Sequence, residues 1–438
     1  MSSIVLARLT LASAMIVGFS HCGDPQKPGS SDLAPTALTF ATPQTGVILG
    51  DTLQLGAWFL DAENRPIGIP PDTVVWTSDD NTVLASLGRD RFHALKEGLA
   101  LVRGATTYRG RTFEVDRVFA VVPSIPGGLV WLRQAALGGP MRLVWSPSTP
   151  INPEVLPPAG HPDGGQGLPA VSPDGRMVIV QSPRSLSATA PFGLFSVDLV
   201  TGSVFEVTSQ MTRHQVAPRW APDGDKLIFT SNERGPWDLW SIDYPDLVAT
   251  LRVQLDATRP IFFDVAPNDG RLVAALPTTP GGEDLWEGAL GELFSRRITA
   301  TPAVSKTNPR VNASGDLIAY TSFGHDSTDA NTAQVITRAT GNLVLSIRQT
   351  LLPAFASSET NHFYSSAEVS SWSVDDRFLL ISWSVNGRRI SSGSVADVWD
   401  YSPEIYAIRV ADTLAIRLTR YGPADVQAEF VQAKRVGR

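Results

Sequence analysis

Residues 218–243 read PRWAPDGDKLIFTSNERGPWDLWSID, and this stretch decides the fold. The aromatic residue Trp220 precedes the tight turn 221–224, in which Pro presets φ, Asp bonds back to its own backbone and Gly takes the positive-φ position. An alternating strand is predicted over 226–231 and a further strand over 238–243, with a polar loop between them. A meander of such short strands cannot bury both of its faces alone, so copies of it must stack.

The turn recurs through the C-terminal part of the chain. Its copies end at Gly175, Gly224, Gly270 and Gly315, which are 49, 46 and 45 residues apart, and a worn copy, Ser-Val-Asp-Asp, ends at Asp376. An alternating strand follows each turn, and most copies continue into a third and a fourth strand. A four-stranded repeat of this length is typical of a β-propeller blade.

The chain ends favour closure of the propeller into a ring. Five turns are visible, but residues 129–132 and 142–145 read as the second and third strands of a further blade that lacks its first strand. The tail 426–431 reads as that missing strand, with Phe430 in the place of Trp220. We therefore predict six blades, with the C-terminal strand completing the first blade and removing two open sheet edges.

Length and composition limit the classes of protein to which this chain can belong. The 438 residues exceed one ordinary core, so two or more domains are expected. The formal charge of −7 comes without a basic stripe, which disfavours nucleic acid as a partner. Helical periodicity is almost absent beyond the N-terminus, which predicts an all-β protein. The single cysteine, Cys22, excludes an internal disulfide and a cysteine-based metal cluster.

The first 22 residues predict export. One positive charge precedes an apolar run over 9–19, which is the pattern of a secretory signal segment. The lone Cys22 at its end resembles the bacterial lipoprotein signal, in which the thiol is acylated. That resemblance implies a lipid-anchored protein of the cell envelope, on the periplasmic side or the cell surface. The alternative is ordinary cleavage after Ser20 and secretion. Residues 23–32 read as a tether.

Residues 33–123 predict a β-sandwich of about seven short strands. Three motifs in this segment, Gly-Asp-Thr at 50–52, Trp-Thr-Ser-Asp-Asp at 76–80 and Ala-Leu-Lys-Glu-Gly at 94–98, resemble the bacterial Ig-like domain of group 2. Trp76 is expected to fill the space between the sheets. We interpret this domain as a spacer, and the alternative is that it binds a glycan or protein itself.

Residues 124–438 resemble the WD40-like repeats of TolB-type six-bladed propellers. The shared pattern is aromatic-Ser-Pro-Asp-Gly, a strand, a Ser-Asn-x-x-Gly loop and a Leu-Thr end, and residues 231–235 (Ser-Asn-Glu-Arg-Gly) match that loop. Members of this family serve as protein-binding platforms in the envelope, as domains attached to hydrolases, and occasionally as enzymes. The fold alone therefore decides nothing about activity.

The long loops predict the binding face. Connections between the second and third strands, and between one blade and the next, are long, and alternation places them all on one face of the propeller. Variable loops on a rigid scaffold are where binding normally occurs. The binding-face candidates are Arg213, His214, Arg234, Trp237, His325, Asp326, His362, Tyr364, Arg388 and Arg389.

These patterns favour a non-catalytic protein without a cofactor, which presents its loop face to an envelope protein, a peptide or a glycan. No hydrolase elbow, metalloprotease or phosphate-loop motif occurs. The alternative is a metal-dependent lyase of the pectate-oligomer type, in which His214, His325 and His362 would hold a divalent ion. A Ca²⁺ loop at Asp326, Asp329 and Asn331 and a binding role for the Ig-like domain also stay open.

Overall fold

The structure is a computed structural model of the chain. It describes residues 34–60, 62, 71, 73–134, 139–157, 166–187, 189–278, 281–301, 304–323, 332–347, 366–384, 403–419 and 424–431. The regular elements within these ranges are all β-strands, which confirms the predicted all-β class. No helix with the length and hydropathy of a membrane span occurs in this part of the chain.

The strands of the N-terminal unit belong to three sheets, and two of these sheets face each other across one core. Its strands are β1 (Ala37–Phe40), β2 (Gly46–Ile48), β3 (Thr52–Gln54), β4 (Ala57–Leu60), β5 (Val75–Ser78), β6 (Leu84–Gly88), β7 (Arg91–Ala94), β8 (Gly98–Tyr108) and β9 (Arg111–Val122). The sheet β3-β7-β6 supplies Leu53 and Phe92 to a core that β5 and β9 complete with Trp76 and Phe119. Trp76 is thus buried in this core, as predicted.

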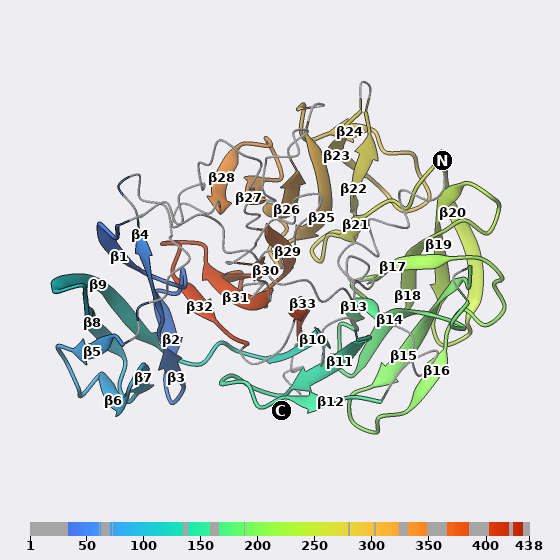
Figure 1. Cartoon of the computed structure of the whole chain (residues 1–438). Coiled ribbons are helices and arrows are strands. Elements are labelled where there is room, and N and C mark those ends of the chain that lie inside the picture. Colours follow the sequence, from blue (N-terminus) through green and yellow to red (C-terminus); the bar gives the residue numbers. More distant parts are fainter. Residues whose placement is uncertain are drawn as a thin grey trace, which may run out of the picture.

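The first half of the C-terminal unit consists of three four-stranded sheets (Figure 1). The first is β12 (Glu154–Val155), β11 (Met141–Ser146), β10 (Gly128–Gln134) and β33 (Ala424–Val431). The second is β13 (Gly167–Val171), β14 (Met177–Pro183), β15 (Phe192–Asp198) and β16 (Val204–Glu206). The third is β17 (Gln215–Trp220), β18 (Lys226–Ser231), β19 (Trp237–Asp243) and β20 (Val248–Ala257).

The second half repeats this order. One sheet is β21 (Phe263–Val265), β22 (Leu272–Pro277), β23 (Glu283–Gly288) and β24 (Arg296–Arg297). The next is β25 (Ser305–Val311), β26 (Leu317–Phe323), β27 (Thr332–Thr337) and β28 (Leu343–Ile347). The last has β29 (Ser366–Trp372), β30 (Phe378–Ser384), β31 (Glu404–Arg409) and β32 (Ala415–Arg417). The strands predicted after each turn are therefore confirmed.

The C-terminal strand lies beside the strand at which the repeats begin. β33 pairs antiparallel with β10, with Gly128 opposite Val431 and Leu129 opposite Phe430 (Figure 1). The first strands of the six sets contact one another in the cyclic order β33, β13, β17, β21, β25, β29 and back to β33. The predicted pairing of the tail with the segment that begins near Leu129 is thus present in the structure.

Turn chemistry explains why the strands start where they do. Gly175 and Gly224 have φ values of +72° and +77°, which an L side chain rarely adopts. In the worn copy, Asp376 takes the same place with a φ of +59°. The hydroxyl of Ser373 accepts the N–H of Phe378 at 2.9 Å, so this turn keeps its hydrogen-bonded form without glycine.

Adjacent sheets are joined through the aromatic anchors and the Leu-Thr ends. The indole of Trp220 donates to the carbonyl of Ala170 in the preceding sheet at 3.2 Å, and the indole of Trp372 donates to the carbonyl of Arg310 at 3.0 Å. Three sheets end in a threonine whose hydroxyl accepts a backbone N–H of the third strand at 2.9 Å. The three threonines are Thr208, Thr299 and Thr419. The threonine of the Leu-Thr end therefore hydrogen-bonds to the third strand of its own sheet.

One contact joins the two units in a way that no sequence pattern predicted. β2 lies parallel to both β9 and β32, so the last repeat and the N-terminal strands form a single eight-stranded sheet. The N–H of Thr45 donates to Ala415 O at 2.9 Å, and Ala415 N donates to Thr45 Oγ1 at 3.0 Å. A Cβ on Gly46 would lie 3.1 Å from Leu414 and Ile416, so this position favours glycine.

Candidate functional site

Four of the predicted binding-face residues come together where two loops meet. Arg213 and His214 end the loop between β16 and β17, whereas Arg234 lies in the loop between β18 and β19 and Trp237 begins β19. The N–H of His214 donates to Asn232 Oδ1 at 3.0 Å, and Asn232 N donates to His214 O at 3.3 Å. The two kinds of long loop therefore share one face at this point, which we call the loop rim.

Glu233 holds the loop rim together. Its carboxylate accepts the N–H of Thr212 at 3.1 Å, the hydroxyl of Thr212 at 2.8 Å and the N–H of Arg213 at 3.0 Å. Burial opposes ionisation, but these bonds outweigh it and hold the pKa of Glu233 below its usual value. The backbone that carries Arg213 is therefore fixed while its side chain is exposed.

The neutral ring of His214 packs between two sheets. Its Nδ1 accepts the N–H of Phe192 at 3.2 Å, so a neutral ring carries its proton on Nε2. Its ring lies 5.8 Å from that of Phe192 and 6.2 Å from that of Trp237, measured between centroids. Burial, and then the charge of Arg184, lower the pKa of His214. These contacts account for the position of the His214 ring by packing.

Arg184 is a rim residue that the sequence patterns missed. Its guanidinium donates to Glu206 Oε1 at 2.6 Å, to Thr208 O at 2.8 Å and to Gln215 Oε1 at 3.0 Å. It follows β14 directly, in the loop between the second and third strands of its sheet. Its position in the repeat is the only signal that could have identified it.

The side chain of Arg234 is held by an ion pair but stays exposed to solvent. Its Nη1 lies 3.2 Å from Asp238 Oδ2, and the Asp238 side chain is fully buried whereas that of Arg234 is 39% exposed. Asp238 Oδ1 accepts the N–H groups of Leu255 and Asp256 at 2.8 and 3.0 Å. Arg213 therefore presents an exposed cation from a backbone that Glu233 holds, and Asp238 holds the partly exposed cation of Arg234 through its side chain.

In the next sheet the equivalent place is filled by a closed ion pair. Lys306 Nζ donates to Asp284 Oδ1 and Glu283 O at 2.9 Å each, and to Thr301 O at 3.2 Å. The exposed fractions of the Lys306 and Asp284 side chains are 2% and 0%. Burial lowers the pKa of Lys306, and Asp284 opposes that shift. The ammonium group of Lys306 makes these bonds between the loops, so it is not available to a ligand.

Six of the candidates and the lipidation candidate fall outside the described residues. These are His325, Asp326, His362, Tyr364, Arg388, Arg389 and Cys22. The described ranges contain no group of three His, Cys, Asp or Glu side chains that could hold a metal ion. Of the three histidines in the lyase alternative only His214 is described, so the predicted metal set stays untested.

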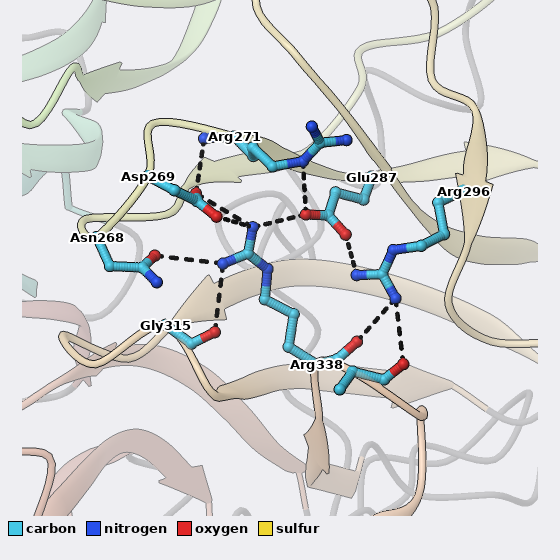
Figure 2. Close-up of polar contacts among 8 residues, drawn as sticks. Asn268, Asp269, Arg271, Glu287, Arg296, Gly315 and Arg338 are labelled. Atoms are coloured by element: carbon cyan, nitrogen blue, oxygen red, sulfur yellow. Dashed lines mark hydrogen bonds and ion pairs between the residues drawn. The ribbon is translucent and has the colours of Figure 1, made fainter.

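A second arginine cluster lies at the opposite, short-turn end of two neighbouring sheets (Figure 2). Arg338 follows β27 and reaches the β21–β22 turn, where it donates to Asn268 Oδ1 at 3.2 Å and Asp269 Oδ2 at 2.8 Å. It also donates to Glu287 Oε1 at 2.6 Å, and Arg271 donates to the same oxygen at 2.8 Å. Both terminal nitrogens of Arg338 thus have acceptors, which identifies a structural clamp between sheets.

The inner strands bring together charges that the sequence patterns also missed. The residue directly before the anchor position is Arg219 in β17, Asp264 in β21, Arg310 in β25 and Glu429 in β33. Arg219 Nη1 and Arg310 Nη2 lie 3.7 and 3.5 Å from the same oxygen, Glu429 Oε1. Arg219 Nε lies 3.3 Å from Asp264 Oδ1. We call these four residues the inner-strand charge cluster.

Comparison with known proteins identifies the fold. No family model matches the sequence, and no curated protein matches it. TolB from Acinetobacter baumannii is similar, at 12% identity and a TM-score of 0.50, over 90% of this chain and 99% of that chain. A chain of the nidogen/laminin complex is similar at 9% identity and a TM-score of 0.49, over 70% of this chain and 99% of the other.

An oligogalacturonate lyase from Vibrio parahaemolyticus is similar at 12% identity and a TM-score of 0.39, over 85% of this chain and 87% of that chain. At such identities a likeness shows the fold and not the activity. The repeated four-stranded sheets and the likeness to TolB together establish that this chain has a β-propeller fold.

Proposed function

We propose that this chain is an exported, non-catalytic binding protein that presents its loop rim to a protein, peptide or glycan of the cell envelope. The observation that carries the proposal is the construction of that rim. Glu233 fixes the backbone at Arg213, Asp238 holds the side chain of Arg234 by an ion pair, and both arginine side chains are exposed. Exposed cations on a rigid, loop-built surface favour an acidic partner.

The scaffold for this function is a ring of six blades closed by β33. The cyclic contacts of the first strands and the pairing of β33 with β10 support that interpretation. Deleting residues 424–438 should leave β10 with an open edge, and we expect the truncated protein to aggregate. A truncated protein that stays monomeric and keeps its unfolding midpoint would contradict closure by this strand.

The N-terminal part completes the proposal. We interpret residues 33–123 as an Ig-like spacer and Cys22 as the site of lipidation, and the buried Trp76 supports the first of these. A Cys22→Ser variant should leave the membrane fraction and lose the mass of the acyl chains. A variant that stays in the membrane fraction would leave the loop-rim proposal intact but remove the lipid anchor.

Partner capture tests the loop rim directly. The exported chain with Arg213→Glu and Arg234→Glu should lose the partners that the unaltered chain captures from envelope extract. Arg377→Glu is a matched control, because its side chain is 55% exposed and lies at the short-turn end. Equal loss in the control would indicate a general charge effect, and equal capture by the double variant would contradict the proposal.

A further inference from the structure

The inner-strand charge cluster is buried at the place where the first strands of different blades approach one another. The side chains of Arg219, Arg310, Asp264 and Glu429 are 7, 9, 13 and 14% exposed. Each comes from a different strand of the cyclic set, so no single blade contains an ion pair of its own. The cluster therefore forms only when the blades assemble.

Both carboxylates are held by the backbone of a neighbouring blade. Glu429 Oε2 accepts the N–H of Val171 at 2.8 Å, and Asp264 Oδ2 accepts the N–H of Val311 at 2.8 Å. These bonds leave one oxygen of each carboxylate directed at the arginines. The acids are thus fixed in position and cannot turn to satisfy further donors.

The two guanidinium groups retain unused donors. Arg219 Nε and Arg310 Nη1 are buried and make no hydrogen bond, although Arg219 Nε lies near Asp264. Arg310 Nε does donate to Ser370 O, and Arg219 Nη1 donates to Pro218 O at 2.6 Å. Buried N–H groups are almost always paired, and the cost of leaving a charged one unpaired is high. Within the described residues neither nitrogen has a hydrogen-bond acceptor, so the cluster is suited to an acceptor from outside the chain.

The charge balance indicates the kind of acceptor. The two guanidinium groups share one carboxylate oxygen, Glu429 Oε1, which lies between them. Asp264 faces Arg219 and Glu429, and burial raises its pKa to about 7 against the opposing effects of Arg219 and the N–H of Val311. When Asp264 is protonated, two guanidinium groups face at most one carboxylate, because burial raises the pKa of Glu429 as well, so at least one positive charge is left without a partner. A single negative charge would then neutralise it.

We propose that the inner-strand charge cluster binds one small monocarboxylate, whose two oxygens accept hydrogen bonds from Arg219 Nε and Arg310 Nη1. A planar carboxylate matches the geometry of guanidinium donors. This site is distinct from the loop rim, since it lies on the inner strands and uses none of the rim residues.

Binding of the anion should be linked to uptake of a proton. The ionised form of Asp264 repels a second carboxylate, so the ligand binds better when Asp264 is neutral. Through Asp264, the affinity should fall above about pH 7 by about tenfold per pH unit until the fully ionised cluster dominates. Asp264→Asn mimics the neutral acid and should lose this part of the pH dependence, and what remains is due to Glu429, whose pKa burial also raises.

Acetate tests this proposal with the exported full-length chain. Saturation-transfer NMR on the acetate methyl group, titrated at pH 6 and pH 8, should give saturable binding that is roughly tenfold weaker at pH 8. Arg310→Gln should weaken binding at pH 6 by at least about tenfold, because it removes a charged donor. Arg377→Gln should bind acetate as the unaltered chain does.

Three outcomes would overturn the proposal. Unsaturable or absent acetate binding at pH 6 would mean that water alone satisfies the two arginines. Equal binding by Arg310→Gln would place the acetate elsewhere, and an unchanged pH dependence in Asp264→Asn would separate binding from this carboxylate. Arg310→Lys keeps the charge without the guanidinium fork, so weaker binding by a folded Arg310→Lys protein separates loss of the site from loss of the fold.

Discussion

Arg338 and Arg310 are both buried arginines that join neighbouring blades, but only one of them has all of its terminal donors in use. Arg338 reaches Asn268, Asp269 and Glu287 through both terminal nitrogens (Figure 2), whereas Arg310 leaves Nη1 without an acceptor. The first arrangement is complete within the chain and acts as a clamp. The second is incomplete, and this difference separates a structural ion network from a candidate binding site.

Removing the clamp should have the largest effect. Arg338→Met would remove the hydrogen bonds to Asn268, Asp269 and Glu287 together, while Arg271 and Arg296 stay beside Glu287. Because several hydrogen bonds to charged groups are lost at once, we expect a loss of about 3 to 5 kcal/mol in the free energy of unfolding. Urea unfolding of this variant and of Arg377→Met, whose residue is surface-exposed, makes the comparison. A loss below about 1 kcal/mol would show that Arg338 is not a clamp.

Replacing an arginine of the inner-strand charge cluster by methionine should lower the free energy of unfolding by less. Arg310→Met leaves Glu429 still facing Arg219 at 3.7 Å, so we expect a loss of about 1 to 3 kcal/mol. Acetate should stabilise the unaltered chain against urea at pH 6 but should not stabilise Arg310→Met. If acetate stabilises both proteins equally, the difference between the two clusters has no functional meaning.

The pH dependence of stability should depend on Asp264. Its pKa is 3.8 in the unfolded chain and about 7 in the folded protein, so the folded state binds the proton more tightly. Stability should therefore fall as pH rises from about 4 to about 7 and stay level above that range, by linkage. Asp264→Asn should reduce this slope by about 1 kcal/mol per pH unit.

The remaining slope in Asp264→Asn is expected from Glu429, whose pKa burial also raises. Unfolding by urea at pH 5, 6, 7 and 8 measures both slopes. The same slope in the variant as in the unaltered chain would mean that Asp264 titrates normally in the folded protein.

The smallest effect is expected at the loop rim. Glu233→Gln weakens three hydrogen bonds at the surface and should cost about 1 kcal/mol at pH 7. Because the folded pKa of Glu233 lies below its usual value, this contribution is present above pH 4.5 and is lost as pH falls through the folded pKa. The difference in stability between the two proteins should therefore shrink as the pH falls below 4.5. A difference that does not shrink on acidification would indicate damage to the packing around His214.

The sequence predicted the repeats because local chemistry determines them. Turn residues such as Gly224 specify their own backbone, and alternation specifies the strand that follows. The place of Phe430 in the last strand predicted its pairing with β10, because an anchor needs a complete blade around it. These signals need no knowledge of distant contacts.

The sequence could not predict what depends on assembly. Arg219, Asp264, Arg310 and Glu429 are far apart in the chain, and each looks like an ordinary strand residue. Only alignment of the repeats on the position before each tight turn places them at one level of the first strands. No local sequence signal predicts the pairing of β2 with β32, because a strand of three residues can pair with any open sheet edge.

The central claim is that the incomplete arginine cluster holds a small carboxylate. A crystal structure of the exported chain grown at pH 6 with bromoacetate tests it most directly, because bromine scatters anomalously. We predict one anomalous peak on the inner strands, with the carboxylate oxygens within hydrogen-bonding distance of Arg219 Nε and Arg310 Nη1. Ordered water at both nitrogens, with no bromine on the inner strands, would contradict it.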